Sequence, residues 1–377
     1  MDLHRAEHEP IYVEISPLLN RRLLTGIGRF AGRLVEALAR LRPLRLVNTI
    51  GGDHARDMQL SNALPLGFEM AVTAADLPSA DHDVGRWARR LVQRRLRKHD
   101  AGAASRCGCV YTMLMPPQRH FKREVAILYD FTPILLPWAH VPATREHFGR
   151  FFGNVAARCD GAIAISQSTK ADAAWLCALP NQRIKVCYPG PSLCVHAHAE
   201  PAQVDRSRNV ILVVSTLEPR KNARFLLDWF LNTSVLDDGM ELWWIGPNGW
   251  LGDRRTDAAR ASPRADKIRF LGMVPDRRLC ALYRLAAFTI YPSLYEGFGF
   301  PVLDSLLHET PVLCSFNSSL QEFEGPGVYF FDACDPESVD EAYLELRGGP
   351  PGVAHVEALR ERFSWDEMAR TVNGLCA

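Results

Sequence analysis

Short apolar runs alternate along the chain with longer segments in which apolar residues recur every three or four positions. Such alternation is typical of parallel β-sheets that are covered by helices. It occurs in two series, so we expect an α/β protein with two sheets. The first series has expected strands at residues 11–16, 125–131 and 161–166, and the second at residues 210–215, 242–246, 267–272, 286–293, 311–315 and 327–331.

Helical segments follow the strands in each series. Apolar residues at helical spacing come after the first strand and predict an amphipathic helix. Its expected buried face carries Ile27, Phe30, Leu34, Val35, Leu38 and Leu41. In the second series, we expect helices around residues 225–231, 276–285 and 301–308.

The length of the chain bears on its number of domains. Its 377 residues exceed what one hydrophobic core usually serves. Residues 188–209 are rich in Pro, His and polar residues and lack periodicity, which is typical of a linker. Two such α/β domains would form a cleft between the carboxyl ends of their strands. The expected division is a first domain at residues 1–190, a linker at 191–209, a second domain at 210–360 and a C-terminal helix at 361–377 that crosses back to the first domain.

Charge and cysteine content narrow the function. The formal net charge is +1, so no overall positive field indicates nucleic acid as the partner. The ten cysteines show neither paired CxxC spacing nor a Cys/His zinc pattern, so we expect reduced thiols and no metal site. The chain has no apolar signal core at its start and no run of eighteen uncharged apolar residues. These features favour a cytoplasmic protein.

The segment TLEPRKN, residues 216–222, lies between an expected strand and an amphipathic helix. Arg220 and Lys221 would then lie at a helix N-terminus, where backbone amides and the helix dipole favour an anion. The forked guanidinium and the compact ammonium together suit a diphosphate. A solvent-exposed basic turn is the alternative.

The segment LYEGFGF, residues 294–300, follows another expected strand. Gly297 and Gly299 allow the backbone to approach a ligand closely. Glu296 is expected at the tip of this loop, in the cleft. Asp304, eight residues later, is expected in the first turns of a helix, where it can bind vicinal hydroxyls as acidic residues bind ribose in dinucleotide sites. Helix capping by Asp304, with an exposed Glu296, is the alternative.

The segment TGIGR, residues 25–29, follows the first expected strand. Backbone amides around Gly26 could contact a phosphate or an acceptor across the cleft. A lone GxG pattern is a weak signal, however, and equally predicts an ordinary tight turn.

Ordered motifs across nearly the whole chain resemble those of one enzyme family. They are TGIGRF, AISQSTKADA, VVSTLEPRKN, LGMVPDRRLCALYRLAAFTIYPSLYEGFGFPVLDSL, TPVLCSFNSSLQEF and FSWDEMA. Together they resemble the retaining nucleotide-sugar glycosyltransferases of family 4, which have the GT-B architecture of two facing Rossmann-like, doubly wound domains. TLEPRKN and SLYEGFGFP are similar to the mannosyl- and rhamnosyl-type transferases of bacterial surface polysaccharide synthesis.

The resemblance implies a reaction and its partners. A hexose, with a mannose-type sugar expected first, moves from a nucleoside diphosphate donor to a glycan or a lipid-linked saccharide, without a metal ion or a cofactor. A GDP-sugar is the first expectation for the donor and a UDP-sugar the second. The second domain would hold the donor and the first domain the acceptor.

The resemblance also implies roles for individual residues. Lys221, helped by Arg220, would neutralise the diphosphate, and Glu296 would touch sugar hydroxyls. Asp304 stands where the family has a second glutamate that binds ribose. Its side chain is one methylene shorter, so either the helix lies closer or a water mediates the contact. The remaining donor-side positions are the backbone at Gly297, Phe298, Gly299 and Phe300, the base-reading segment that contains Met273 and Val274, and the turn at Gly246.

Two further departures from the family pattern are found. Ser215 stands where many relatives have an arginine, which leaves more of the charge to Arg220. Tyr129 and Asp130 stand where the family usually has His-Asp. The resemblance implies attack on the face from which the diphosphate leaves, so the protein contributes positioning and charge stabilisation. Tyr129 is no base at neutral pH, but it can donate a hydrogen bond to a sugar hydroxyl. Asp130 would orient the acceptor or stabilise positive charge, or merely cap a loop.

The segment RWARRLVQRRLRKH, residues 86–99, is densely basic. A basic amphipathic helix there would dock on the anionic inner face of a membrane, where a lipid-linked acceptor lies. A surface helix that packs on its own domain is the alternative.

Two other functions fit the same fold. One is a sugar-nucleotide epimerase or phosphorylase, and the other is a non-catalytic nucleotide-sugar-binding protein. A dehydrogenase is disfavoured, since no G-x-G-x-x-G follows a strand with an acidic residue about twenty positions later.

Overall fold

The chain forms two compact units. The computed structural model describes residues 9–15, 26–47, 68–72, 97–98, 104–112, 121–149, 159–193, 209–236, 239–249, 265–349, 353 and 356–377. Unit 1 consists of Met1–Asp130, Glu146–Ser192 and Phe363–Ala377, and unit 2 of Phe131–Arg145 and Leu193–Arg362. The segment Phe131–Arg145 thus groups with unit 2, although the expected first domain included it.

Unit 2 contains a six-stranded parallel sheet in the order β11-β10-β9-β12-β13-β14. Its strands are β9 (Val210–Val214), β10 (Glu241–Ile245), β11 (Ile268–Gly272), β12 (Phe288–Tyr291), β13 (Val312–Ser315) and β14 (Val328–Phe331). The chain starts at the centre, runs outward to β11, and returns to β12 on the other side of β9. The strand order therefore reverses between β9 and β12, which is the point where open α/β sheets bind their ligands.

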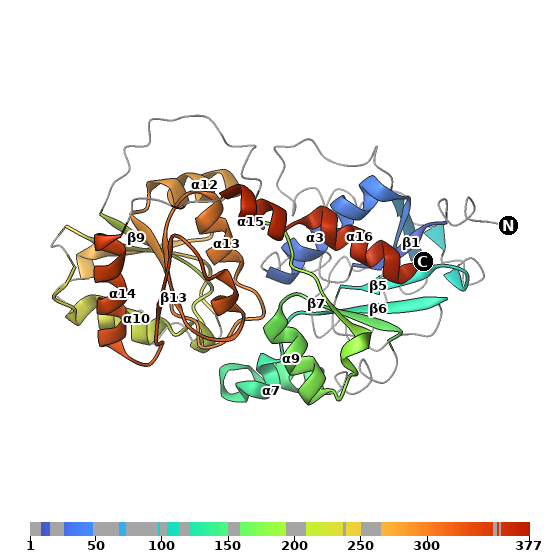
Figure 1. The fold of residues 1–377 in the computed structure, drawn as a ribbon, viewed down its shortest axis with the longest axis horizontal. Helices are drawn as coiled ribbons and strands as arrows, with labels where there is room; N and C mark the ends of the chain where they lie inside the picture. Colours follow the sequence, from blue (N-terminus) through green and yellow to red (C-terminus); the bar gives the residue numbers. More distant parts are fainter. Residues whose placement is uncertain are drawn as a thin grey trace. The chain divides into compact units, whose positions relative to one another are not determined.

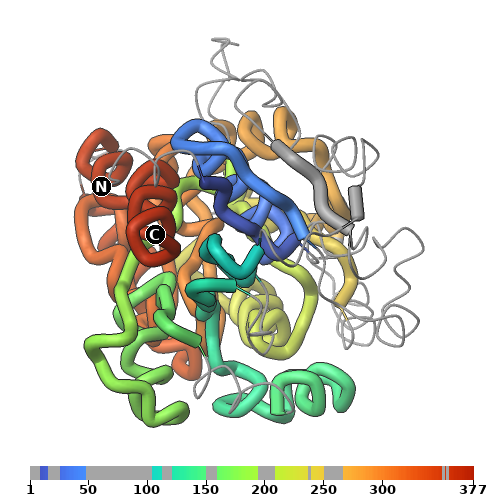
Figure 2. Tube along the Cα trace, turned by 90° about the vertical axis from the view of Figure 1, so that its right-hand side faces the viewer, coloured from blue at the N-terminus to red at the C-terminus, as the bar shows by residue number. Residues whose placement is uncertain are grey.

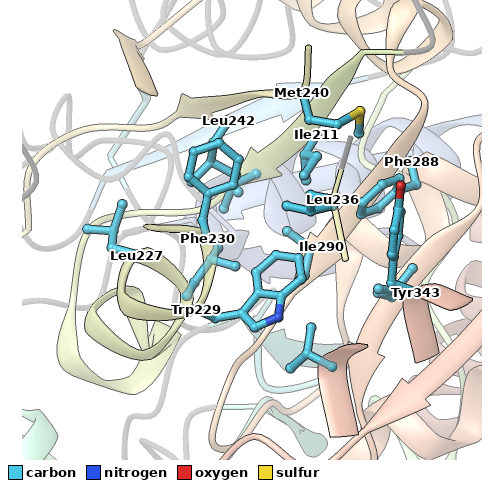
Figure 3. Packing of buried hydrophobic residues seen from close by; sticks show 14 of the residues in the cluster. Ile211, Leu227, Trp229, Phe230, Leu236, Met240, Leu242, Phe288, Ile290 and Tyr343 are labelled. Carbon is cyan, nitrogen blue, oxygen red and sulfur yellow. The ribbon is translucent and has the colours of Figure 1, made fainter. Parts of the chain in front are cut away.

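Alternating residues of the β9 strand point into two different cores. Ile211 and Val213 lie in one cluster with Trp244 and Phe230, and this cluster appears in Figure 3. Leu212 lies in the other cluster with Tyr283. Both faces of the sheet are buried, which explains why its strands are continuous apolar runs.

Helices cover these two faces of the unit 2 sheet. Helices α10 (Ala223–Asn232) and α14 (Pro336–Gly348) lie beside the first cluster, and α12 (Asp276–Leu285) lies beside the second (Figure 1). Helix α13 (Phe300–Leu307) follows β12, and α15 (Val356–Arg362) packs on α13. The three helices expected in this part of the sequence are present, with ends that differ by at most two residues.

Unit 1 contains an eight-stranded sheet in the order β4-β3-β2-β1-β5-β6-β7-β8. Its strands are β1 (Ile11–Glu14), β2 (Leu44–Val47), β3 (Phe68–Val72), β4 (Arg97–Lys98), β5 (Gly108–Tyr111), β6 (Arg123–Leu128), β7 (Gly161–Ala164) and β8 (Ile184–Val186). Six of these strands are parallel, but β3 pairs antiparallel with β2 and with β4. The α/β prediction is confirmed, whereas a purely parallel first sheet is wrong at this edge.

Helix α16 (Trp365–Cys376), at the C-terminal end that is red in Figure 2, packs on α3 (Gly26–Leu41) and on β5 and β6. Trp365 meets Phe30 edge to face at 5.1 Å between ring centroids. The backbone of Cys376 lies so close to Gly108 that a Cβ there would collide with it. Helix α16 is therefore an integral layer of unit 1.

The start of α3 corrects the interpretation of TGIGR. Residues 26–29 form the first turn of the helix, and Gly26 is exposed there. The GxG pattern is a helix start, so the expected tight turn is wrong over these residues. Of the expected buried face, Phe30 is fully buried, but Ile27 and Leu41 are 42% and 46% exposed because they lie at the two ends of the helix.

The sequence also predicted a basic helix at residues 86–99, reduced cysteines and no metal site. Arg97 and Lys98 form strand β4, so a helix over residues 86–99 is wrong at these two positions, and residues 86–96 and 99 lie outside the described residues. Within the described part, no helix is long and apolar enough to cross a membrane. The described cysteines are free, and the described residues contain no group of three or more His, Cys, Asp or Glu that could hold a metal ion.

Candidate functional site

The candidate site lies at the carboxyl ends of β9 and β12 in unit 2. After β9 the chain passes through the short helix η4 (Pro219–Lys221) into α10. After β12 it passes through residues 292–299 into α13. Because β9 and β12 are parallel neighbours, the two loops lie side by side, and Leu294 N donates a hydrogen bond to Arg220 O at 2.9 Å. The TLEPRKN and LYEGFGF segments therefore meet at the point where the strand order reverses.

Four charged side chains from these loops form one cluster. Glu296 accepts hydrogen bonds from Arg220 Nη1 at 2.7 Å and from Lys221 Nζ at 2.5 Å, each to a different carboxylate oxygen. Arg220 Nη2 also donates to Glu218 Oε1 at 3.0 Å. We call Arg220, Lys221, Glu218 and Glu296 the charged cluster. It has two cations and two carboxylates, so its formal charges balance.

Burial excludes the plainer alternatives for these residues. The side chains of Arg220, Lys221 and Glu296 are only 14%, 12% and 8% exposed. A solvent-exposed basic turn and an exposed Glu296 are therefore both wrong. A buried ion pair of this kind carries a desolvation cost, so it is weak support for a purely stabilising role.

A tyrosine completes the arrangement. Lys221 Nζ donates to the hydroxyl of Tyr291 at 2.6 Å, and this hydroxyl donates to Glu296 Oε1 at 3.1 Å. Tyr291 is the last residue of β12 and is buried. The ammonium also lies 5.0 Å from the centroid of the Tyr291 ring.

Two serines from η6 (Ser318–Phe323) hold the backbone of the glycine-containing loop. Glu296 N donates to Ser318 Oγ at 2.9 Å. Ser319 Oγ contacts the carbonyls of Glu296 and Phe298 at 2.9 and 2.8 Å. The segment that follows β13 therefore holds the backbone of the loop around Glu296 in place.

The ionisation of the cluster follows from burial and mutual pairing. Burial alone would raise the pKa of Glu296, but the charges of Arg220 and Lys221 outweigh it and lower the pKa to about 2. Burial lowers the pKa of Lys221, while the charge of Glu296 opposes that shift. Burial raises the pKa of Tyr291 well above 10, and the charge of Glu296 raises it further. Glu296 is therefore a carboxylate and Tyr291 a neutral phenol at physiological pH.

The depressed pKa of Glu296 predicts a loss of stability in acid. A carboxyl whose folded pKa is about 2 and whose unfolded pKa is near 4.5 stabilises the fold fully above pH 4.5, and this contribution is lost as the pH falls toward 2. A pKa lowered from 4.5 to about 2 corresponds to about 3 to 4 kcal/mol of stability above pH 4.5. In urea unfolding between pH 6 and 2.5, the difference in free energy between the parent and Glu296→Gln should shrink as the pH falls. Parallel curves for the two proteins would contradict this assignment.

The residues after Glu296 are buried up to the first residue of α13, Phe300, which is half-buried. Phe298 is buried and packs on Phe300 and Phe323 at 5.2 and 5.3 Å between centroids, so its side chain belongs to the core. Gly299 has a φ of +115°, and a Cβ there would lie 2.8 Å from the side chain of Leu320. Gly297 is buried and Phe300 half-buried. Contact of a ligand with the backbone of these four residues stays a prediction.

Asp304 lies in the second turn of α13 and is 2% exposed. The N-cap of this helix is Gly299, and no side chain caps it, so the capping alternative for Asp304 is wrong. Its backbone carbonyl accepts a hydrogen bond from His308 N at 3.2 Å.

The other donor-side candidates lie at the ends of β10 and β11. Gly246 has a φ of +143°, and a Cβ there would collide with the carbonyl oxygen of Ser215. Gly246 N donates to Gly272 O at 3.0 Å, which joins this turn to the end of β11. Met273 is 59% exposed, whereas Val274 packs against the core beside α12. At the ends of β10 and β11, the backbone of Gly246 thus lies close to that of Ser215, and the apolar side chain of Met273 is exposed.

The candidates in unit 1 follow β6. The hydroxyl of Tyr129 donates to Thr112 O at 2.8 Å, and its ring meets Phe30 edge to face. A hydroxyl has one proton to donate, so donation to a sugar would require the Thr112 bond to break. Burial raises the pKa of Tyr129 well above 10, which excludes it as a base. Asp130 is half-buried beside it.

Glu218 and Tyr291 belong to the site but were absent from the sequence expectations. Glu218 stands within TLEPRKN and Tyr291 opens the run before LYEGFGF, so both lay inside quoted motifs. Only their position at the carboxyl end of an expected strand could have indicated that they belong to the site. The contact of Tyr291 with Lys221 depends on the strand order, whereas Glu218 and Arg220 are only two residues apart.

Parts of the chain match a family model and curated proteins. Residues 197–358 match the family model described as "Glycosyl transferases group 1". The O-antigen chain mannosyltransferase B of Escherichia coli is 34% identical over 174 residues, which are 43% of this chain and 44% of that protein, so the match spans less than half of that relative. The O-antigen chain mannosyltransferase RfbU of Salmonella typhimurium is 24% identical over 264 residues, which are 68% of this chain and 70% of that protein.

Solved structures give the same architecture. Alr3699/HepE of Anabaena, in complex with UDP-glucose, matches with a TM-score of 0.64 at 15% identity over 97% of this chain and 99% of that one. At this identity the likeness shows the fold, which is GT-B. Residues 197–358 are thus similar to the group 1 glycosyl transferases, and the chain has the GT-B fold of these solved structures.

Proposed function

We propose that the protein transfers a hexose, of the mannose type, from a nucleoside diphosphate donor to a glycan or lipid-linked saccharide in surface polysaccharide synthesis. The observation that carries this proposal is the charged cluster at the β9/β12 reversal point. Two cations there are close enough to share one carboxylate, so they can also share one diphosphate. The names of the two relatives, both O-antigen chain mannosyltransferases, support the sugar and the pathway class.

In this proposal, Glu296 exchanges partners when the donor binds. Without donor, its carboxylate neutralises Arg220 and Lys221. The diphosphate then takes over the two cations, and Glu296 turns to the hydroxyls of the sugar. The exchange keeps the buried cations paired in both states, which avoids the cost of an unpaired buried charge.

The remaining candidates take the other parts of the donor and the acceptor. Asp304 binds the ribose, and the backbone at Gly246, Met273 and Val274 faces the base. Asp130 orients the acceptor in unit 1. Transfer proceeds with retention and without a metal ion, since two cations already neutralise the leaving group. Contact of residues 86–99 with an anionic membrane also remains a prediction.

A thermal-shift screen tests the donor class. A ligand that binds only the folded state stabilises it by mass action, by about 2.7 kcal/mol at one hundred times its dissociation constant. We expect GDP and GDP-mannose to raise Tm most, UDP and its conjugates second, and ADP and dTDP least. HepE was solved with UDP-glucose, which keeps UDP as the second expectation.

The reaction is then followed by NMR of the anomeric proton with and without EDTA. A product with the anomeric configuration of the donor, formed equally in EDTA, supports retention without metal. No Tm shift with any nucleotide would contradict the proposed function. Release of an epimer, or a requirement for inorganic phosphate, would indicate the epimerase or phosphorylase alternative, and binding without turnover would indicate a binding protein.

A further inference from the structure

The hydroxyl of Tyr291 joins the two residues to which the proposed function gives opposite ends of the donor. It lies 2.6 Å from Lys221 Nζ and 3.1 Å from Glu296 Oε1. Lys221 Nζ also bonds the same carboxylate oxygen at 2.5 Å, so the three groups close a triangle. We propose that Tyr291 is a positioning residue that directs Lys221 toward the diphosphate and Glu296 toward the sugar. This assignment rests on the proposed function.

The place of Tyr291 in the sheet makes it a fixed point. It ends a central strand, it is 3% exposed, and it pairs in register with Cys314 of β13. Its carbonyl accepts a hydrogen bond from Ser315 Oγ at 3.3 Å. Lys221 and Glu296, in contrast, belong to η4 and to the loop between β12 and α13. Lys221 and Glu296, from separate loops, thus both hydrogen-bond to Tyr291 of the sheet.

A neutral phenol suits this place chemically. Its oxygen accepts a hydrogen bond from an ammonium while its proton is donated to a carboxylate, whereas a carboxylate can only accept and an ammonium can only donate. Burial keeps the phenol protonated. One of the three ammonium protons of Lys221 is therefore fixed on Tyr291, which sets the directions of the other two. An oriented charge contributes to transition-state stabilisation without reorganisation.

Tyr291→Phe tests this role because it keeps the ring, and with it the contact of the ring with the ammonium, and removes only the hydroxyl. Tyr343→Phe is the matched control, since Tyr343 is also 3% exposed and packs on Phe288 in the core of the same unit. We expect kcat of Tyr291→Phe to fall about tenfold while KM for the donor changes less than about threefold. Both parameters of Tyr343→Phe should stay within about twofold of the parent.

A second measurement reports on Lys221 without any substrate. Competitive acetylation with acetic anhydride at a series of pH values, followed by peptide mapping, gives the pKa of Lys221. Loss of the phenol oxygen removes an acceptor that stabilises the charged ammonium, so this pKa should fall by about half a unit or more in Tyr291→Phe. It should be unchanged in Tyr343→Phe.

These measurements separate the positioning role from the proposed function. An unchanged kcat in Tyr291→Phe, or a reduced kcat with an unchanged Lys221 pKa, would overturn the positioning role and leave the proposed function intact. A parent protein that neither binds a nucleoside diphosphate nor transfers a sugar would overturn the proposed function. The Lys221 pKa would still show, in that case, whether the phenol holds the ammonium.

Discussion

Glu296→Gln should abolish most sugar transfer and yet tighten the binding of the bare nucleoside diphosphate. In the parent, the Glu296 carboxylate occupies both Arg220 and Lys221. A diphosphate must displace it, and the neutral amide of glutamine competes far less for the two cations. We expect the affinity for the bare diphosphate to rise roughly tenfold, which corresponds to ~1.4 kcal/mol. Transfer should lose about 2 to 4 kcal/mol of transition-state stabilisation, because the sugar loses the hydrogen bonds that position its anomeric carbon.

The same variant should be less stable in the absence of ligand. Removal of Glu296 leaves two buried cations with Glu218 as the carboxylate of the charged cluster, and breaking a buried pair costs about 3 to 5 kcal/mol. Glu241→Gln is the matched control, because Glu241 forms a partly exposed pair with Arg269 that is worth at most about 1 kcal/mol. Calorimetry with GDP and UDP gives the affinity, initial rates give the transfer, and urea unfolding at pH 7 gives the stability. Weaker diphosphate binding in Glu296→Gln would show that the carboxylate does not compete for the cations.

Lys221→Ala should lose turnover chiefly. The ammonium stabilises the leaving diphosphate more as that group gains negative charge, so its removal should cost about 2 to 4 kcal/mol, or about thirtyfold to a thousandfold in kcat. Binding of the bare diphosphate should also weaken, in contrast to Glu296→Gln. The two variants thus move diphosphate affinity in opposite directions while both depress transfer.

Arg224→Ala controls for the loss of one positive charge near the site. Arg224 lies in the first turn of α10, only three residues after Lys221, but its side chain is 74% exposed and pairs with Asp228. Its removal should leave kcat within about twofold, because exposed charges are screened by solvent and salt. A kcat for Lys221→Ala as high as that of Arg224→Ala would remove Lys221 from the reaction.

The sequence predicts the second sheet well because both of its faces are buried. Continuous apolar runs such as VILVVS and AAFTIYPS can then be located without any alternation of polar residues. The first sheet was harder to predict, since strand β8 has three residues, of which one is buried. The antiparallel strand β3 lies far from the motifs that mark the fold. The GxG pattern in TGIGR wrongly predicted a tight turn, because glycines at a helix start and glycines in a turn give the same sequence pattern.

The candidate site was predicted as a set of residues but not as an arrangement. Strand ends located Lys221 and Glu296 at the correct edge, since both follow apolar runs. Their direct pairing could not be predicted, because 75 positions separate them and only the order β9-β12 brings their loops together. For the same reason, the balance of charge in the cluster and the link through Tyr291 were not visible in the sequence.

The position of α16 determines how the two units can be separated. A single cut between residues 192 and 193 leaves Phe363–Ala377 covalently attached to unit 2, although these residues belong to unit 1. During synthesis, α16 leaves the ribosome after all of unit 2. Unit 1 therefore cannot pack this helix on α3, β5 and β6 until unit 2 has been synthesised. Unit 2 is contiguous apart from one short segment and needs nothing made after residue 362. The usual order, in which the N-terminal domain folds first, is therefore reversed for the completion of these two units.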